Sequence, residues 1–213
     1  MKKTFLAFLI LSVGLTACKK DSDSTEDNFE DLKTTALIDF TNIVALPTYQ
    51  QLNNKALFFK SAIQNLNTNA TEANLTIAKD AWKDMRSTWE QSEGFLFGPV
   101  EDNDYDPHMD TWPTDYVQMD SLMNSTNPLS LTDIQALTLS LRGYHPIEYI
   151  LFGNHGNRTA ASISSRQKEY MVSLTTDLQS TCEALYQSWS SAPVNYSSQV
   201  INAGNGSTVY QTK

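Results

Sequence analysis

The sequence predicts an all-α fold, a helical bundle. In this 213-residue chain, apolar residues recur at spacings of three and four, and almost no segment alternates apolar and polar residues as a half-buried strand does. The two longest segments stay amphipathic over several turns. Helices are expected over residues 28–45, 48–67, 71–97, 113–124, 130–152 and 160–190, within a domain that covers residues 28–190.

The N-terminus is typical of an export signal. Lys2 and Lys3 precede an apolar run at residues 5–13, which is too short for the roughly 20 residues that span a bilayer. The run ends in Leu15-Thr16-Ala17-Cys18, which resembles the lipobox cut by bacterial lipoprotein signal peptidase. We expect a signal peptide at residues 1–17 and lipidation of Cys18; an ordinary secreted protein with an incidental cysteine is the alternative.

Residues 18–27 are polar and mostly acidic, and we expect them to form a flexible tether. Removing residues 1–17 takes away two lysines and no acid, so the formal charge falls from −9 to −11. Such an acidic chain makes nucleic acid an unfavourable partner. Cys182 is then the only cysteine besides Cys18, which excludes an internal disulfide and a thiolate-rich metal site, and we expect it to be buried.

Two boundaries of the predicted helices carry local signals. Residues 98–107 are acidic and rich in turn-forming residues, so we expect a loop there. Ser130 and Asp133 have the spacing of a capping box at the start of the helix predicted over 130–152. Residues 191–213 show no further apolar period and are expected to be a polar tail, or a domain that continues beyond the sequence.

The helix predicted over residues 71–97 places a carboxylate beside its buried stripe. Glu93 follows Trp89 by four residues and falls at the edge of that stripe, as a site residue or as a partly exposed acid at the rim of the core. The stripe itself consists of Leu75, Ala78, Trp82, Met85, Trp89 and either Leu96 or Phe97.

In the helix predicted over 130–152, Glu148 falls at the centre of the apolar face, where an ionised carboxylate needs a cation, hydrogen bonds or a metal. His145 lies three residues earlier, so the two side chains can converge on one metal ion, as Glu-x-x-His pairs do in carboxylate bundles. The alternative is a core pair in which His145 and Glu148 bond each other or Arg86.

Two further residues near this pair have two interpretations each. Pro146 marks either a functional defect in the helix or a plain kink or helix restart. Asp115 follows Pro113 near the start of the helix predicted over 113–124, where it is a site residue or simply favours the helix dipole.

Four segments in order resemble the imelysin family. Gly143-Tyr144-His145-Pro146-Ile147-Glu148 resembles its Gly-x-His-x-x-Glu signature, and the segment from Ala81 to Arg86, with Trp89 and Glu93, resembles its Trp-and-Arg helix. Phe95-Leu96-Phe97-Gly98-Pro99 and Asp110-Thr111-Trp112-Pro113-Thr114-Asp115 resemble its Phe-Gly-Pro and Trp-Pro segments. The resemblance covers about residues 30–190.

This resemblance implies an envelope protein of two bundle-like halves with the His-x-x-Glu motif near their interface, of which this chain supplies mainly the first half. Members were first classed as metallopeptidases and are related to the periplasmic component of bacterial iron-uptake systems. The site residues implied here are His145 and Glu148, with Glu93, Asp115 and Arg86 as neighbours.

Metal capture is favoured over peptidase chemistry. A zinc peptidase of the inverted His-x-x-Glu-His pattern would need a histidine where Tyr149 stands. One imidazole with carboxylates suits iron, manganese, zinc or calcium, and iron is the expected metal, with zinc as an alternative. A metallopeptidase with Glu148 as base or ligand, and a structural or adhesive lipoprotein, remain open. The expected partners are the membrane, through Cys18, and an iron-uptake protein of the bacterial envelope, at the outer membrane on its periplasmic or surface face.

Overall fold

The computed structural model describes residues 23–213, with side chains from residue 28 on. The expected signal peptide and the expected lipidation site, Cys18, lie outside this range. Within the described range, no helix is both long enough and apolar enough to cross a bilayer.

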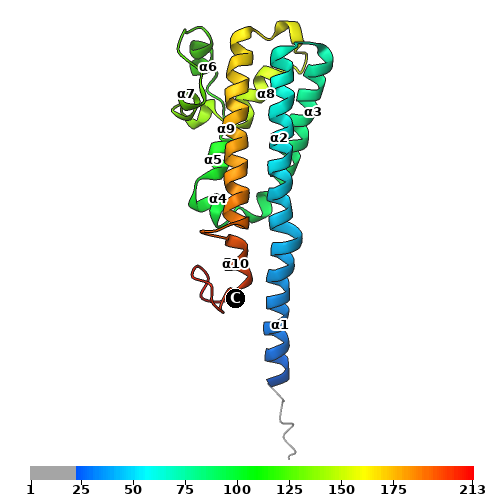
Figure 1. Cartoon of the computed structure of the whole chain (residues 1–213), viewed down its shortest axis with the longest axis vertical. Coiled ribbons are helices and arrows are strands. Elements are labelled where there is room, and N and C mark those ends of the chain that lie inside the picture. The colour runs from blue at the N-terminus through cyan, green and yellow to red at the C-terminus, as the bar shows by residue number, and fades with distance from the viewer. Residues whose placement is uncertain (1–22) are drawn as a thin grey trace, which may run out of the picture.

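A single long helical rod runs along the molecule (Figure 1), made of α1 (Asp23–Asp39), the π-helical segment η1 (Phe40–Ala45) and α2 (Leu46–Thr68). It begins five residues before the predicted start at residue 28, inside the expected tether. The predicted break near Pro47 is absent. The Leu46 N–H bonds to the carbonyl of Thr41, five residues back, and this wider turn carries the helix past a proline that has no N–H to offer.

The core lies where α2 packs against α3 (Glu72–Ser92) and α9 (Ser165–Ser190), as Figure 1 shows. The stripe predicted for α3 is confirmed as far as Trp89, since Leu75, Ala78, Trp82, Met85 and Trp89 are all buried. Leu96 and Phe97 lie beyond the end of α3 and are half-buried. Cys182 is also buried, as predicted. The 3-10 turn η2 (Glu93–Phe95) ends α3, and the 3-10 turn η4 (Ala160–Ser162) precedes α9.

The acidic segment after α3 is not the loop that its composition predicts. It contains two short helices, α4 (Pro99–Asp102) and α5 (Tyr105–Asp110). Val100 and Met109 are buried, so two apolar contacts outweigh the turn-forming residues around them. The next helix, α6 (Tyr116–Met123), begins three residues later than predicted, so Pro113 lies outside it.

The single helix predicted over residues 130–152 is wrong. The segment contains α7 (Leu131–Gln135), the 3-10 turn η3 (Leu139–Leu141) and α8 (Tyr144–Phe152). The predicted capping box of Ser130 and Asp133 is present at the start of α7. Gly143, with φ of +77°, ends any continuous helix, and Pro146 falls in the first turn of α8, where no N–H is needed. Pro146 therefore marks a helix restart.

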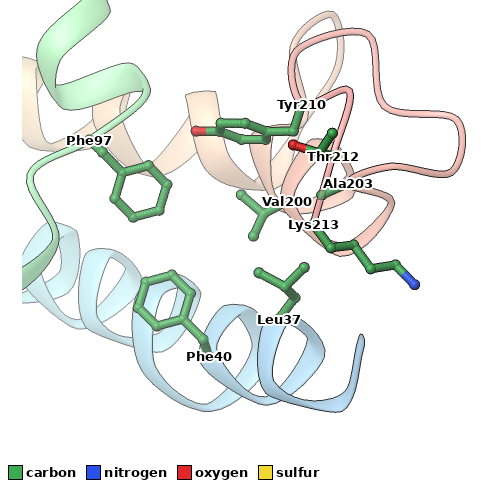
Figure 2. A pocket seen from close by; sticks show the side chains of 8 residues that line it. All are labelled: Leu37, Phe40, Phe97, Val200, Ala203, Tyr210, Thr212 and Lys213. Atoms are coloured by element: carbon green, nitrogen blue, oxygen red, sulfur yellow. The ribbon is translucent and has the colours of Figure 1, made fainter. Parts of the chain in front are cut away.

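The C-terminal segment also departs from the prediction, because it packs on the bundle. The short helix α10 (Tyr196–Ile201) buries Tyr196 and Val200, and Ala203 is buried just after it. An apolar cavity of about 420 Å³ lies between this segment, α1 and η1 (Figure 2). None of the predicted site residues lines it.

Candidate metal site at the start of helix α8

A close backbone approach at Gly143 sets the position of α8. A Cβ atom at Gly143 would lie 2.1 Å from the carbonyl oxygen of Met109 and 3.1 Å from that of His108. Only glycine permits this contact, and the positive φ independently favours glycine. The end of α5 is therefore held directly against the start of α8, which brings Asp110 next to His145.

A buried ion pair fixes the residue just before this glycine. Arg142 donates from Nε and Nη2 to the two carboxylate oxygens of Asp177 on α9, at 3.0 and 3.1 Å, and both side chains are buried. The hydroxyl of Tyr170, also on α9, donates to the carbonyl of Leu141 at 2.5 Å. The start of α8 is thus tied to α5 on one side and to α9 on the other.

His145 lies between two carboxylates. Its Nε2 is 2.9 Å from Oδ1 of Asp110, and its Nδ1 is 3.0 Å from Oε2 of Glu148. The predicted convergence of His145 and Glu148 is present, and their direct contact is also what the alternative of a hydrogen-bonded core pair predicts. Arg86 pairs with Asp110. The ring of Trp112 lies edge-on to the imidazole, with centroids 4.7 Å apart.

Asp110 is the residue at this site that sequence reasoning missed. Its Oδ2 accepts from the indole N–H of Trp89 at 2.8 Å and is ion-paired with Arg86. Burial is the largest single influence on this carboxyl and acts to raise its pKa, but hydrogen bonds from His145, Arg86 and Trp89 together hold the pKa of Asp110 below its usual value. The sequence signal that could have identified Asp110 is the Trp-Pro segment, which begins at this residue. From that segment, Asp115 was predicted as the site residue instead.

The ionised state of Asp110 decides the tautomer of His145. A carboxylate can only accept, so the proton on the neutral imidazole lies on Nε2 and Nδ1 turns its lone pair toward Glu148. That arrangement needs a second proton or a cation between Nδ1 and Oε2. Burial, the largest influence, lowers the pKa of His145, but the hydrogen bonds to Asp110 and Glu148 outweigh it and raise the pKa above its usual value.

His145 and Glu148 face a cavity of about 190 Å³. The side chain of Glu148 is 40 % exposed, so its predicted place at the centre of a buried face is wrong. That place assumed one helical phase from residue 130 to 152, whereas the restart at Gly143 turns Ile147 and Ile150 toward the core. The cavity is lined by Trp112, Tyr116, His145, Glu148, Tyr149, Phe152, Gly153 and Asn154.

Glu93 does not line this cavity and lies in an acidic cluster with Asp106 and Asp110. Oxygens of Glu93, Asp106 and Asp110 lie within 4.8 Å of one another. Burial and the charges of Asp106 and Asp110 raise the pKa of Glu93, and burial and Asp110 raise the pKa of Asp106. These two acids resist ionisation beside Asp110, which keeps its charge.

The two remaining predicted residues have different places. Arg86 is at the site: it pairs with Asp110 and with Glu90, at 2.6 Å from the latter, and its guanidinium lies 5.0 Å from the ring centre of Tyr144. Asp115 caps α6, accepting from the backbone N–H of Gln118 at 2.9 Å, and it does not line the cavity. The capping interpretation of Asp115 is therefore the one that the structure supports.

Comparisons with known proteins concern the family and the fold of this chain. The model of the imelysin family matches residues 45–211. Iron-regulated protein A of Synechococcus elongatus is 31 % identical over 175 residues, which are 81 % of this chain and 46 % of the relative.

Two crystal structures share the fold. A protein of Parabacteroides distasonis, described as an iron-regulated protein A precursor, is 26 % identical with a TM-score of 0.73 over 82 % of this chain and 51 % of the other. An imelysin-like protein of Psychrobacter arcticum is 15 % identical with a TM-score of 0.66, over 81 % and 55 % of the two chains, and shows the fold alone. The chain spans about half the length of these relatives. By the match over residues 45–211, the chain belongs to the imelysin family.

Proposed function

We propose that this chain is a lipid-anchored protein of the bacterial envelope that captures a metal ion, iron being the favoured one, through His145 and Glu148. Asp110 orients the imidazole and Arg86 balances the charge of Asp110. Captured metal would then pass to an uptake partner in the envelope.

The observation that carries the proposal is the placement of His145 Nδ1 against Glu148 Oε2 at 3.0 Å, beside an open cavity. Two neighbouring ligands of one ion, each about 2.1 Å from it, have a separation of this size. Histidines that bind metals almost always donate their other N–H to a carboxylate or a carbonyl, and Nε2 of His145 does so to Asp110. The residues present therefore fit a metal ion.

The donor types are compatible with iron, and the names of two relatives favour it. An imidazole and a carboxylate, without thiolate, suit iron and manganese as well as zinc. Two relatives carry the name iron-regulated protein A, which supports iron among these metals. When bound, the ion would be held as cargo by His145 and Glu148, while Asp110 keeps the ring in the orientation that points Nδ1 at the cavity.

The test is metal binding by the full chain in detergent, titrated with Mn²⁺ and, without oxygen, with Fe²⁺. We expect His145→Ala and Glu148→Gln each to weaken binding about tenfold or more, because each removes a ligand. The matched controls are His155→Ala and Glu169→Gln, which change an exposed histidine and an exposed acid that do not line the cavity. Equal binding by wild type and both site variants would overturn the proposal.

A further inference from the structure

A second cavity adjoins the one that His145 and Glu148 face. It has a volume of about 350 Å³, and it shares Tyr149, Gly153 and Asn154 with the first. Its other lining residues are Asn157, Arg158, Thr159 and Ser162. The two cavities together form one continuous strip of surface along the end of α8 and the segment that follows it.

The lining of this second cavity suits an oxyanion. It offers a guanidinium, two amides and the hydroxyls of Tyr149, Thr159 and Ser162, the last of which already donates to the carbonyl of Thr159, and it contains no carboxylate. The Nε–H of Arg158 donates to the carbonyl of Ile150 at 3.1 Å, which holds the side chain in place. No ion pair among residues 28–213 involves Arg158, so its charge is free to meet an anion.

Two lysines add to the positive charge at this place. The ammonium groups of Lys79 and Lys83 each lie 5.6 Å from the ring centre of Phe152, a residue that lines the His145 cavity. Lys79 also donates to the carbonyl of Arg158 at 3.0 Å, and Lys83 is 3.6 Å from Asp80. Three cations thus gather beside the cavity in a chain whose formal charge is −9. A bare metal cation gains nothing from them, whereas an anion is attracted.

The small number of metal ligands in the first cavity also favours an anionic complex over a bare metal ion. Among the residues that line the first cavity, only His145 and Glu148 supply an imidazole or a carboxylate. Iron and manganese bound by oxygen and nitrogen generally take about six ligands. The remaining positions on the ion are filled from outside this cavity, and a chelator that carries its own donor atoms can fill them.

We infer that the cargo is an anionic metal chelate, an iron(III) complex of a small polycarboxylate, whose metal meets His145 and Glu148 while its outer carboxylate meets Arg158 and Thr159. This inference rests on the proposed function and specifies its substrate class. A guanidinium recognises a carboxylate through two parallel N–H donors, and hydroxyls add further donors.

Equilibrium dialysis of the full chain in detergent tests this, with ferric citrate, citrate alone and Mn²⁺ as the three probes. We expect ferric citrate to bind at least about tenfold more tightly than citrate alone. Arg158→Gln should weaken ferric citrate binding about tenfold and leave Mn²⁺ binding unchanged. Lys83→Gln, at a side chain that is 60 % exposed, should weaken ferric citrate binding less without affecting folding. The control, Lys33→Gln, removes the same charge on α1.

The outcomes separate the two proposals. If Arg158→Gln and Lys83→Gln bind ferric citrate as Lys33→Gln does, or if citrate alone binds as tightly as ferric citrate, the chelate inference is overturned. A similar loss of Mn²⁺ and ferric citrate binding in Arg158→Gln would also overturn it, because the residue would then support the fold and not the chelator. Failure of the metal site itself would instead show as unchanged Mn²⁺ binding in His145→Ala.

Discussion

Asp110 and His145 are 35 residues apart in sequence, yet Oδ1 of the first and Nε2 of the second are joined by a 2.9 Å hydrogen bond. This bond sets the direction of the imidazole and leaves Nδ1 facing Glu148. We therefore propose that Asp110 orients the metal-binding histidine and does not itself bind the metal.

Replacing Asp110 by asparagine should weaken metal binding about 10- to 100-fold, the usual effect of losing a group that orients a metal-binding histidine. Calorimetric titration with Mn²⁺ measures the change. Asp106→Asn is the matched control, since Asp106 lies beside Asp110 but has no contact with His145. If Asp106→Asn lost more metal affinity than Asp110→Asn, the metal would be bound by the cluster of Glu93, Asp106 and Asp110 and not by His145.

Metal affinity should rise with pH through the range in which His145 loses its proton. The raised pKa of His145 means that the imidazolium persists above about pH 6.5, and a protonated Nδ1 cannot bind a metal. Mn²⁺ titrations from about pH 6 to about pH 8.5 should therefore show tightening binding. In His145→Ala this slope should disappear, and a slope of the same size in the variant would contradict the assignment.

The stability of the metal-free protein should change with pH in the opposite direction. Folding raises the pKa of His145, so its protonated form stabilises the folded state. This stabilisation is fully present below the pKa of the unfolded chain and is lost as pH rises through the pKa of the folded protein. Asp110, whose pKa is lowered, stabilises above about pH 3.9. The difference in unfolding free energy between wild type and His145→Ala should thus be largest between about pH 4 and 6.5, as urea denaturation would reveal.

Gly143→Ala should lower the stability of the protein by more than the strain of its positive φ alone would cause. Both Gly143 and Gly156 have positive φ, of +77° and +72°, so the backbone strain of an alanine is about 1–3 kcal/mol at either. At Gly143 the new Cβ also meets the Met109 carbonyl, whereas nothing lies within 4 Å at Gly156. Thermal unfolding should show a clearly larger loss for Gly143→Ala, with weaker metal binding because α5 is displaced. Equal losses in the two variants would exclude the steric argument.

Asp177→Asn should destabilise the protein by about 3–5 kcal/mol, because it leaves the buried guanidinium of Arg142 without a counter-charge. Glu169→Gln, which breaks the exposed pair with Arg166, should cost less than about 1 kcal/mol. Denaturant unfolding of both variants gives the comparison. A small effect of Asp177→Asn would mean that α8 is held mainly by its apolar contacts.

The sequence was informative where local periodicity decides structure. The buried stripe of α3, the capping box of Ser130 and Asp133, and the convergence of His145 with Glu148 all depend on residues within a few positions of each other. Each of these was predicted and is present.

It was misleading where distant backbone segments meet. The break at Gly143 depends on the Met109 carbonyl, 34 positions earlier in the numbering, and without it the helical phase of residue 130 was carried on to Glu148. The same contact brings Asp110 to His145, so no local pattern could have identified that pair. Asp115 shared a segment with Asp110 and was selected on proximity to a helix start, where it serves as a cap.

The most direct test of the central claim is the anomalous diffraction signal from crystals of the full chain soaked in Mn²⁺. We expect an anomalous peak about 2.0–2.3 Å from both His145 Nδ1 and Glu148 Oε2, with Asp110 still accepting the hydrogen bond from Nε2. A peak among Glu93, Asp106 and Asp110 with His145 unligated, or no peak near either group, would contradict it.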